Sequence, residues 1–254
     1  MPIQEKFLPI FKDHFMFSDK LQGASRALRG KVRIIVFYIS DAESGWTEDE
    51  IKSENRLWLS VVAKIQKLAD ESNVPLELSV AVAPRTVKAT CTVDNTHEWI
   101  EEALAPYGAA TAAEYQVKYE NEHGFDEAPV VFVIDKPFRS YAQSASRECP
   151  RADEFSVVMG KSKERTLIHE LLHQFGANDL YYPDDVREAA NAYLPNSIMG
   201  PCGGTKWDSL TRCLIGWSDC IDEKAALFLL LTQHHTDDTI REALKIEWQR
   251  KFNA

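Results

Sequence analysis

The chain has 254 residues, of which 44% are hydrophobic and 27% are charged, and its formal net charge is -10. A chain of this size can bury a full hydrophobic core, and without a long polar linker we expect one catalytic domain, residues 1–254. The acidic balance argues against a nucleic-acid groove, because phosphate binding requires clustered lysine and arginine. No apolar run reaches the roughly 20 residues needed to cross a bilayer, so we expect no membrane partner either.

Hydrophobic patterning predicts an α+β fold, in which a twisted mixed β-sheet packs on helices. The predicted strands are residues 31–40, 76–82, 130–134 and 156–159. Pro84 is expected to stop the second of these strands. One predicted helix carries residues 169–173, and the others are residues 46–72, 99–104, 109–119, 184–193, 208–217, 223–232 and 238–252. Residues 31–179 would thus supply the sheet and the central helix, and residues 180–254 a turn and the C-terminal helices.

The stretch His-Glu-Leu-Leu-His at residues 169–173 has the spacing of a catalytic zinc site. On a helix, residues four apart lie one turn above another, so His169 and His173 can aim two imidazole nitrogens at one point, with Glu170 beside it. This spacing predicts two metal ligands and a general base. The plainer alternative is a pair of hydrogen-bonded histidines on an amphipathic helix, with Glu170 in solvent.

A third ligand is expected just beyond this helix, because catalytic zinc takes three protein ligands and leaves one position for water. Gly176 can end the helix in a left-handed turn, which would bring the carboxylate of Asp179 back to the metal. Glu170 would then take a proton from the water and later pass it to the leaving amine.

A second motif, Asn-Ser-Ile-Met-Gly-Pro-Cys-Gly-Gly at residues 196–204, predicts a tight turn around one methionine. Together the two motifs resemble the metzincin metallopeptidases, and most closely the bacterial snapalysin and immune-inhibitor types, which have aspartate as third ligand. The resemblance covers residues 164–204. It implies a zincin-like fold, one catalytic Zn²⁺ ion and endopeptidase activity on a polypeptide substrate. It also implies that His169, His173 and Asp179 are zinc ligands, that Glu170 is the general base, and that Met199 lies in the turn beneath the metal.

The sequence departs from the family at two positions. Many metzincins have histidine where this chain has Asp179, and some have a tyrosine two residues after the turn methionine, where this chain has Pro201. A tyrosine that contacts the oxyanion or the metal-bound water would therefore come from elsewhere, and Tyr181, Tyr182 and Tyr193 are the candidates. Ordinary half-buried aromatic packing is the alternative for all three.

Two further alternatives concern the third ligand and the strand before the helix. In a gluzincin arrangement, Glu188 on the predicted helix 184–193 would replace Asp179, although Gly176 and the methionine turn would then have no part. In metallopeptidases of this architecture the preceding strand tends to be an edge to which an extended substrate can pair. For residues 156–159, this interpretation and a covered strand without a substrate role both remain open.

Other activities and locations also remain open at this point. A zinc-binding but inactive interaction protein and a zinc hydrolase of non-peptide amides are the functional alternatives. The start of the sequence shows no signal peptide, which favours a cytoplasmic protein with reduced cysteines. Export by a non-classical route, with a disulfide among Cys202, Cys213 and Cys220, is the alternative. A monomer is the default, and surface positions are expected for the isolated histidines His14, His97 and His123 and for the pair His234 and His235.

Overall fold

The computed structural model describes residues 2–3, 14–17, 20, 22–145, 152–200 and 203–232. The chain divides into two compact units. The first, here called the sheet unit, comprises Ser18–Asn178 and Leu214–Trp217. The second, called the helical unit, comprises Met1–Phe17, Asp179–Cys213 and Ser218–Ala254. Whether they act as one catalytic domain stays a prediction.

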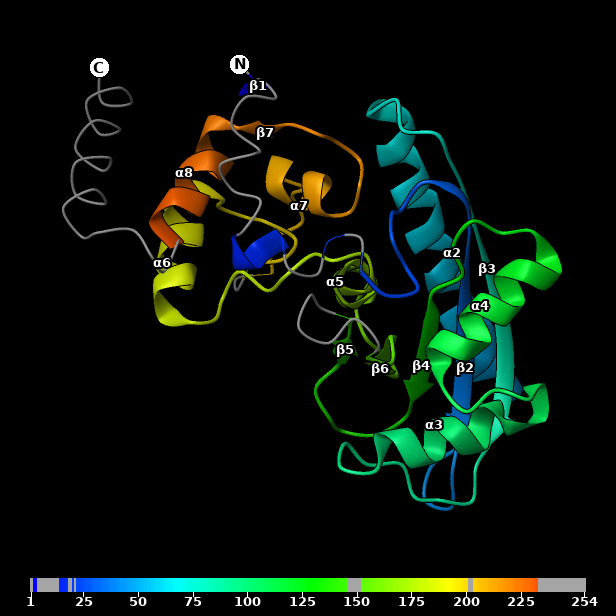
Figure 1. The fold of residues 1–254 in the computed structure, drawn as a ribbon. Coiled ribbons are helices and arrows are strands. Elements are labelled where there is room, and N and C mark those ends of the chain that lie inside the picture. The colour runs from blue at the N-terminus through cyan, green and yellow to red at the C-terminus, as the bar shows by residue number, and fades with distance from the viewer. Residues whose placement is uncertain are drawn as a thin grey trace. The chain divides into compact units, whose positions relative to one another are not determined.

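A five-stranded mixed sheet organises the sheet unit, in the order β3-β2-β4-β6-β5. Its strands are β2 (Gly30–Ser40), β3 (Leu76–Thr86), β4 (Val130–Ile134), β5 (Tyr141–Gln143) and β6 (Phe155–Met159). Neighbouring strands are parallel except for β5, which runs antiparallel to β6. Figure 1 labels all five strands. The central strands β2 and β4 read as nearly continuous apolar runs because helices cover both of their faces.

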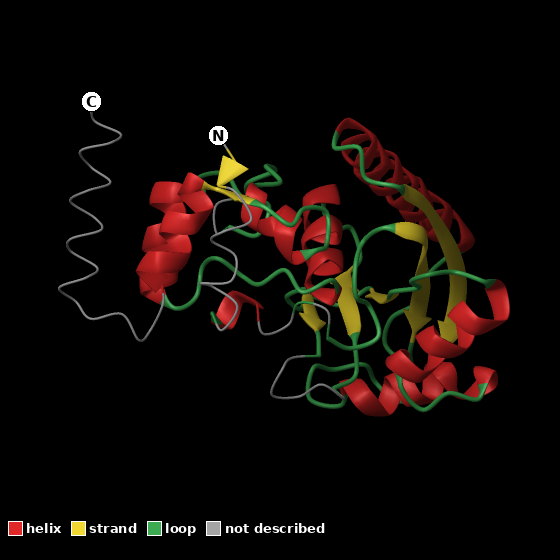
Figure 2. Ribbon diagram, turned by 45° about the horizontal axis from the view of Figure 1, so that its top comes forward, coloured by secondary structure: helices red, strands yellow, loops and turns green. Residues whose placement is uncertain are grey.

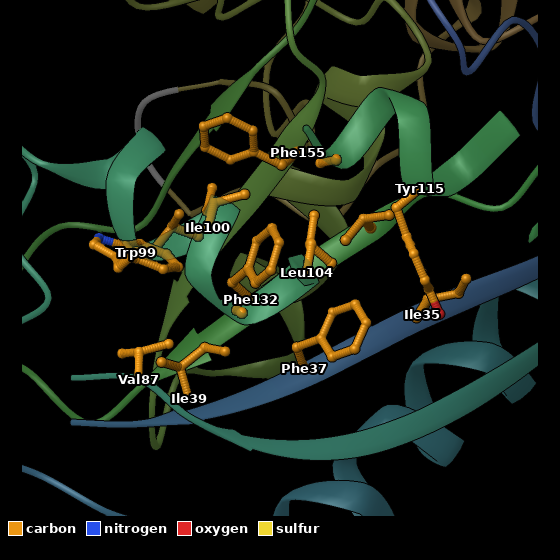
Figure 3. Packing of buried hydrophobic residues seen from close by; sticks show 14 of the residues in the cluster. Ile35, Phe37, Ile39, Val87, Trp99, Ile100, Leu104, Tyr115, Phe132 and Phe155 are labelled. Atoms are coloured by element: carbon orange, nitrogen blue, oxygen red, sulfur yellow. The ribbon is translucent and has the colours of Figure 1, made fainter. Parts of the chain in front are cut away.

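One face of the sheet packs against α3 (Thr96–Leu104) and α4 (Ala112–His123). Aromatic rings fill this layer (Figure 3). The centroid of the Phe132 ring lies 5.6 Å from that of Phe37 and 5.5 Å from that of Trp99. Phe155 and Val157 of β6 point into the same cluster. Because side chains alternate along a strand, Ser156 between them points to the opposite face.

That opposite face carries α2 (Glu48–Glu71) and α5 (Glu164–Gln174), so the strands lie between two helical layers (Figure 2). Helix α2 begins with a capping box, in which Thr47 and Glu50 satisfy each other's backbone N–H groups. Its Lys64 forms an ion pair of 2.7 Å with Glu164, the first residue of α5. Helix α5 is therefore tied to its neighbouring helix as well as to the sheet.

The helical unit contains α6 (Asp184–Tyr193), α8 (Glu223–Thr232) and most of α7 (Ser209–Leu214), together with a short antiparallel pairing of β1 (Pro2–Ile3) with β7 (Ile221–Asp222). Helices α6 and α8 contact each other. Asp208 caps α7, because its carboxylate accepts the backbone N–H of Thr211 at 3.0 Å.

The structure confirms most of the predicted elements, shifts the bounds of several, among them α4 (predicted 109–119, observed Ala112–His123), and decides one open alternative. Strand β3 continues through Pro84 instead of ending there, since an edge strand pairs on one side only and tolerates a residue without an N–H group. Strand β6 is not an edge, because β5 covers it. Helix α7 is shorter than 208–217 and stops before Gly216, whose φ is +80°. The predicted helix 238–252 and the pair His234 and His235 lie outside the described residues.

Candidate metal centre

The end of helix α5 has the form that the sequence predicts. Gly176 adopts a φ of +86°, a left-handed conformation that glycine takes without steric cost. Its N–H donates to the carbonyl of His173 at 2.9 Å, and the N–H of Ala177 donates to the carbonyl of Leu172 at 3.1 Å. These two bonds form a Schellman motif, which turns the chain sharply away from the helix axis.

The two histidines of α5 meet as the four-residue spacing predicts. Nε2 of His169 lies 3.3 Å from Nε2 of His173, and the ring planes are inclined at 86° to each other. His169 is buried and His173 is half-buried. Both imidazoles therefore direct the same ring nitrogen toward one point at the edge of the helix.

The helix ending also determines which nitrogen of His173 carries a proton. Nδ1 of His173 lies 2.6 Å from the carbonyl oxygen of Ala177, which can only accept a hydrogen bond. In the neutral ring Nδ1 must therefore hold the hydrogen, which leaves the lone pair of Nε2 available as a ligand. A backbone carbonyl behind a metal-binding histidine commonly fixes both its tautomer and its ring orientation.

The nitrogen separation fits a tetrahedral metal ion. Two nitrogens bound to zinc at 2.0–2.1 Å and at the tetrahedral angle would lie about 3.3–3.4 Å apart. The observed 3.3 Å between the two Nε2 atoms agrees with this value. The same separation would also suit a hydrogen bond in which Nε2 of His169 donates to Nε2 of His173 when no cation is bound.

Glu170 completes a three-residue cluster that could hold or serve a metal ion. One carboxylate oxygen of Glu170 and one nitrogen of each histidine all lie within 4.8 Å of one another. Glu170 is 6% exposed, so the alternative that places it in solvent is wrong. Its carboxylate lies close enough to the two nitrogens to reach a water that they help to position.

Two residues that the sequence reasoning missed hold this part of α5 against the sheet. The hydroxyl of Ser156 on β6 donates to the backbone carbonyl of Glu170 at 2.8 Å. Nε2 of Gln174 donates to the same hydroxyl at 2.8 Å and to the carbonyl of Val130 at 3.1 Å. Nothing in the sequence marked Ser156 or Gln174, because α5 contains several other polar residues and β6 is otherwise apolar.

The other predicted site residues belong to the helical unit. Within that unit, the N–H of Leu180, next to Asp179, donates to the carbonyl of Met199 at 3.0 Å. Met199 is completely buried in a turn closed by the N–H of Gly200 and the carbonyl of Ser197. Convergence of Asp179 and Met199 on the histidines stays a prediction.

The tyrosines and the alternative ligand also lie in the helical unit. Tyr182 is 78% exposed, and Tyr181 and Tyr193 are half-buried. Glu188 is exposed on α6. A contact of these tyrosines with the oxyanion and metal binding by Glu188 both stay predictions.

The remaining expectations have mixed outcomes. His14 is buried rather than at the surface, because its Nε2 lies 3.1 Å from the hydroxyl of Thr232 and its Nδ1 accepts the N–H of Met16. Cys91 and Cys220 are free thiols, while Cys149 and Cys202 lie outside the described residues. Within the described part of the chain, no helix combines the length and apolarity needed to span a bilayer.

Comparison with known proteins yields only distant likenesses, all among solved structures. No protein-family model matches the sequence, and no curated protein matches it. Among solved structures, the chain is similar to metalloproteinase-II from Bacteroides fragilis, with 15% sequence identity and a TM-score of 0.34. The match covers 66% of this chain and 49% of that one, so it spans about half of the other protein. At this level of similarity the match carries no argument about activity.

Proposed function

We propose that the chain is a zinc-dependent endopeptidase of metzincin type, which hydrolyses peptide bonds in a polypeptide substrate. The observation that carries this proposal is the arrangement of His169, Glu170 and His173 on α5. Two imidazole nitrogens are 3.3 Å apart, and a carboxylate oxygen lies within 4.8 Å of both. A structural zinc site would gain nothing from a carboxylate in this position, whereas a hydrolase needs a base beside the metal-bound water.

The chemistry follows from these side chains. A bound zinc ion would supply Lewis acidity and would lower the pKa of its water toward about 7. Glu170 would accept a proton from the attacking water and donate it to the leaving amine. The bond from Nδ1 of His173 to the carbonyl of Ala177 would keep that ring in the tautomer that binds metal.

Asp179 is the proposed third ligand, in the place that the family resemblance implies. The Schellman ending of α5 supports this assignment, because it reverses the chain three residues before Asp179. The bond between Leu180 and Met199 supports a role for the methionine turn in holding this segment. Tyr181, Tyr182 and Tyr193 remain candidates for a contact with the oxyanion.

Metal analysis combined with an activity assay tests the proposal. The wild-type protein should contain one zinc ion per chain, cleave proteins in an unfractionated mixture, and lose that activity to a chelator. Glu170→Gln should retain zinc and lose cleavage, because the amide cannot accept the proton. Asp179→Ala should lose both zinc and cleavage.

Glu188→Gln provides the matched control, since it removes an exposed carboxylate from helix α6. It should leave zinc binding intact, and loss of zinc in this variant would favour the gluzincin arrangement. Zinc in a wild-type protein that cleaves no peptide would favour an inactive binding protein. Cleavage of small amides without cleavage of peptides would favour a non-peptide hydrolase.

A further inference from the structure

A short chain of buried hydrogen bonds connects the metal-binding part of α5 to strands β6 and β4 beneath it. It runs from the carbonyl of Glu170 to the hydroxyl of Ser156, and from there to the side-chain amide of Gln174 and the carbonyl of Val130. Ser156 is completely buried and Gln174 is 1% exposed. The Ser156 hydroxyl thus donates to the carbonyl of Glu170 and accepts from the side-chain amide of Gln174.

The apolar contacts of α5 do not by themselves determine how far the helix is turned about its axis. Its buried residues occupy nearly consecutive positions and do not form a single stripe; they are Leu167, Ile168, His169, Glu170, Leu171, Leu172 and Gln174. Apolar burial is non-directional, so several rotations of such a helix would bury similar area. Hydrogen bonds depend steeply on angle and distance, and they distinguish between these rotations.

The anchored side and the metal-binding side of α5 are linked by helix geometry. At 100° per residue, Gln174 projects about 40° to one side of Glu170, while His173 and His169 project about 60° and about 100° to the other side. Side-chain tips lie about 5–6 Å from the axis, so a rotation of about 10° would move each ligand atom by about 1 Å. A displacement of that size is enough to cost about 100-fold in rate.

We propose that Ser156 and Gln174 are positioning residues, which fix the rotation of α5 and thereby aim Glu170 and both histidines at the metal position. The inference rests on the proposed function only in taking this cluster as a metal site. Neither residue touches the reacting atoms, since both act through the backbone of α5.

Two variants test this inference, and a third serves as a control. Ser156→Ala removes the central hydroxyl, and Gln174→Leu removes both amide donors, so one remains informative if the other fails to fold. Ser60→Ala is the matched control. The exposed hydroxyl of Ser60 on α2 donates at 2.9 Å to Glu164, which lies at the other end of α5 from Gln174. Crystal structures of the metal-free proteins, Co²⁺ absorption spectra and Zn²⁺ titrations are then compared with wild type.

Both test variants should show α5 rotated by about 10° or more and a wider spread of the distance between the two Nε2 atoms. Affinity for Zn²⁺ should fall about 10-fold to 100-fold, and the visible bands of bound Co²⁺ should shift, while Ser60→Ala matches wild type. If wild type proves to be a peptidase, kcat should fall with KM little changed. An unchanged helix rotation in folded variants would overturn the inference, whether or not the protein has peptidase activity.

Discussion

Glu154, which immediately precedes β6, is a buried carboxylate whose ionisation should make folding stability depend on pH. Its side chain is 1% exposed, and its oxygens accept the backbone N–H groups of Ala24, Ser25 and Ala145. Burial raises the pKa of Glu154 from 4.5 to about 7, and the charge of Asp153 adds to the increase. The three N–H donors oppose this shift but do not cancel it.

The direction of the pH effect follows from the raised pKa. The folded state holds the proton on Glu154 more tightly than the unfolded state, so this contribution to stability is complete below about pH 4.5 and is lost as the pH rises through about 7. A difference of this size corresponds to about 3 kcal/mol in the free energy of unfolding. The slope between these values should be at most about 1.4 kcal/mol per pH unit.

Urea unfolding of the metal-free protein, followed by circular dichroism from about pH 5 to about pH 8, measures the effect. Glu154→Gln cannot ionise, so its stability should fall less steeply over this range than that of wild type. At about pH 5 the variant should be less stable, because its NH₂ group would face a backbone N–H donor. Glu101→Gln on the exposed side of α3 controls for the loss of one charge. Equal slopes for wild type and Glu154→Gln would refute the reasoning.

Three further predictions concern other positions and the metal. Gly176→Ala should cost about 1–2 kcal/mol in urea unfolding, because a φ of +86° is strained for alanine, and unchanged stability would contradict the left-handed ending of α5. Asp41→Ala should cost about 3 kcal/mol by the same measurement, because it takes the less exposed of two acidic partners from the half-buried Lys136 ammonium, 3.0 Å away. Glu43→Ala, which removes a 65% exposed partner of the same lysine, should cost at most about 1 kcal/mol. Zinc at 100 times its dissociation constant should stabilise the protein by about 3 kcal/mol in thermal unfolding, and a chelator should reverse this gain.

The elements that the sequence predicts well are those with a clear local pattern. Helices α6 and α8 have the predicted bounds, and β2 differs by one residue. Helix α2 lies within the predicted range 46–72, and its buried residues Trp58, Val61 and Ile65 recur at helical spacing. Such signals need only neighbours along the chain, so they can be read before any tertiary contact is known.

The wrong end of β3 and the open question about β6 both lie where the neighbouring strand decides the outcome. Whether β6 is an edge depends on β5, a three-residue strand whose sequence Tyr-Ala-Gln has no distinctive periodicity. Pro84 ends a strand when both sides must be paired, but β3 has a partner on one side only. Periodicity along one segment cannot show which segments lie beside it.

The residues of the candidate site also fall into those that local spacing predicts and those that only tertiary packing brings in. A spacing of four residues brings His169 and His173 together because a helix fixes their relation locally, and Gly176 ends that helix through its own conformation. The hydroxyl of Ser156 reaches Glu170 only because β6 and α5 are packed together, and no motif encodes that contact. Local geometry can thus be recognised from sequence, while the residues that aim it are found only in the fold.

The helical unit gives the spacing of the second motif a physical reason. Helix α6 lies between Leu180 and Met199 in sequence, and its length returns the chain so that the N–H of Leu180 can donate to the carbonyl of Met199. The bond uses the backbone of Met199, so the turn conformation matters more for it than the thioether. Gly204 supports that conformation, since a Cβ atom there would lie 2.2 Å from the carbonyl of Asn196. The methionine turn therefore holds the segment that carries Asp179.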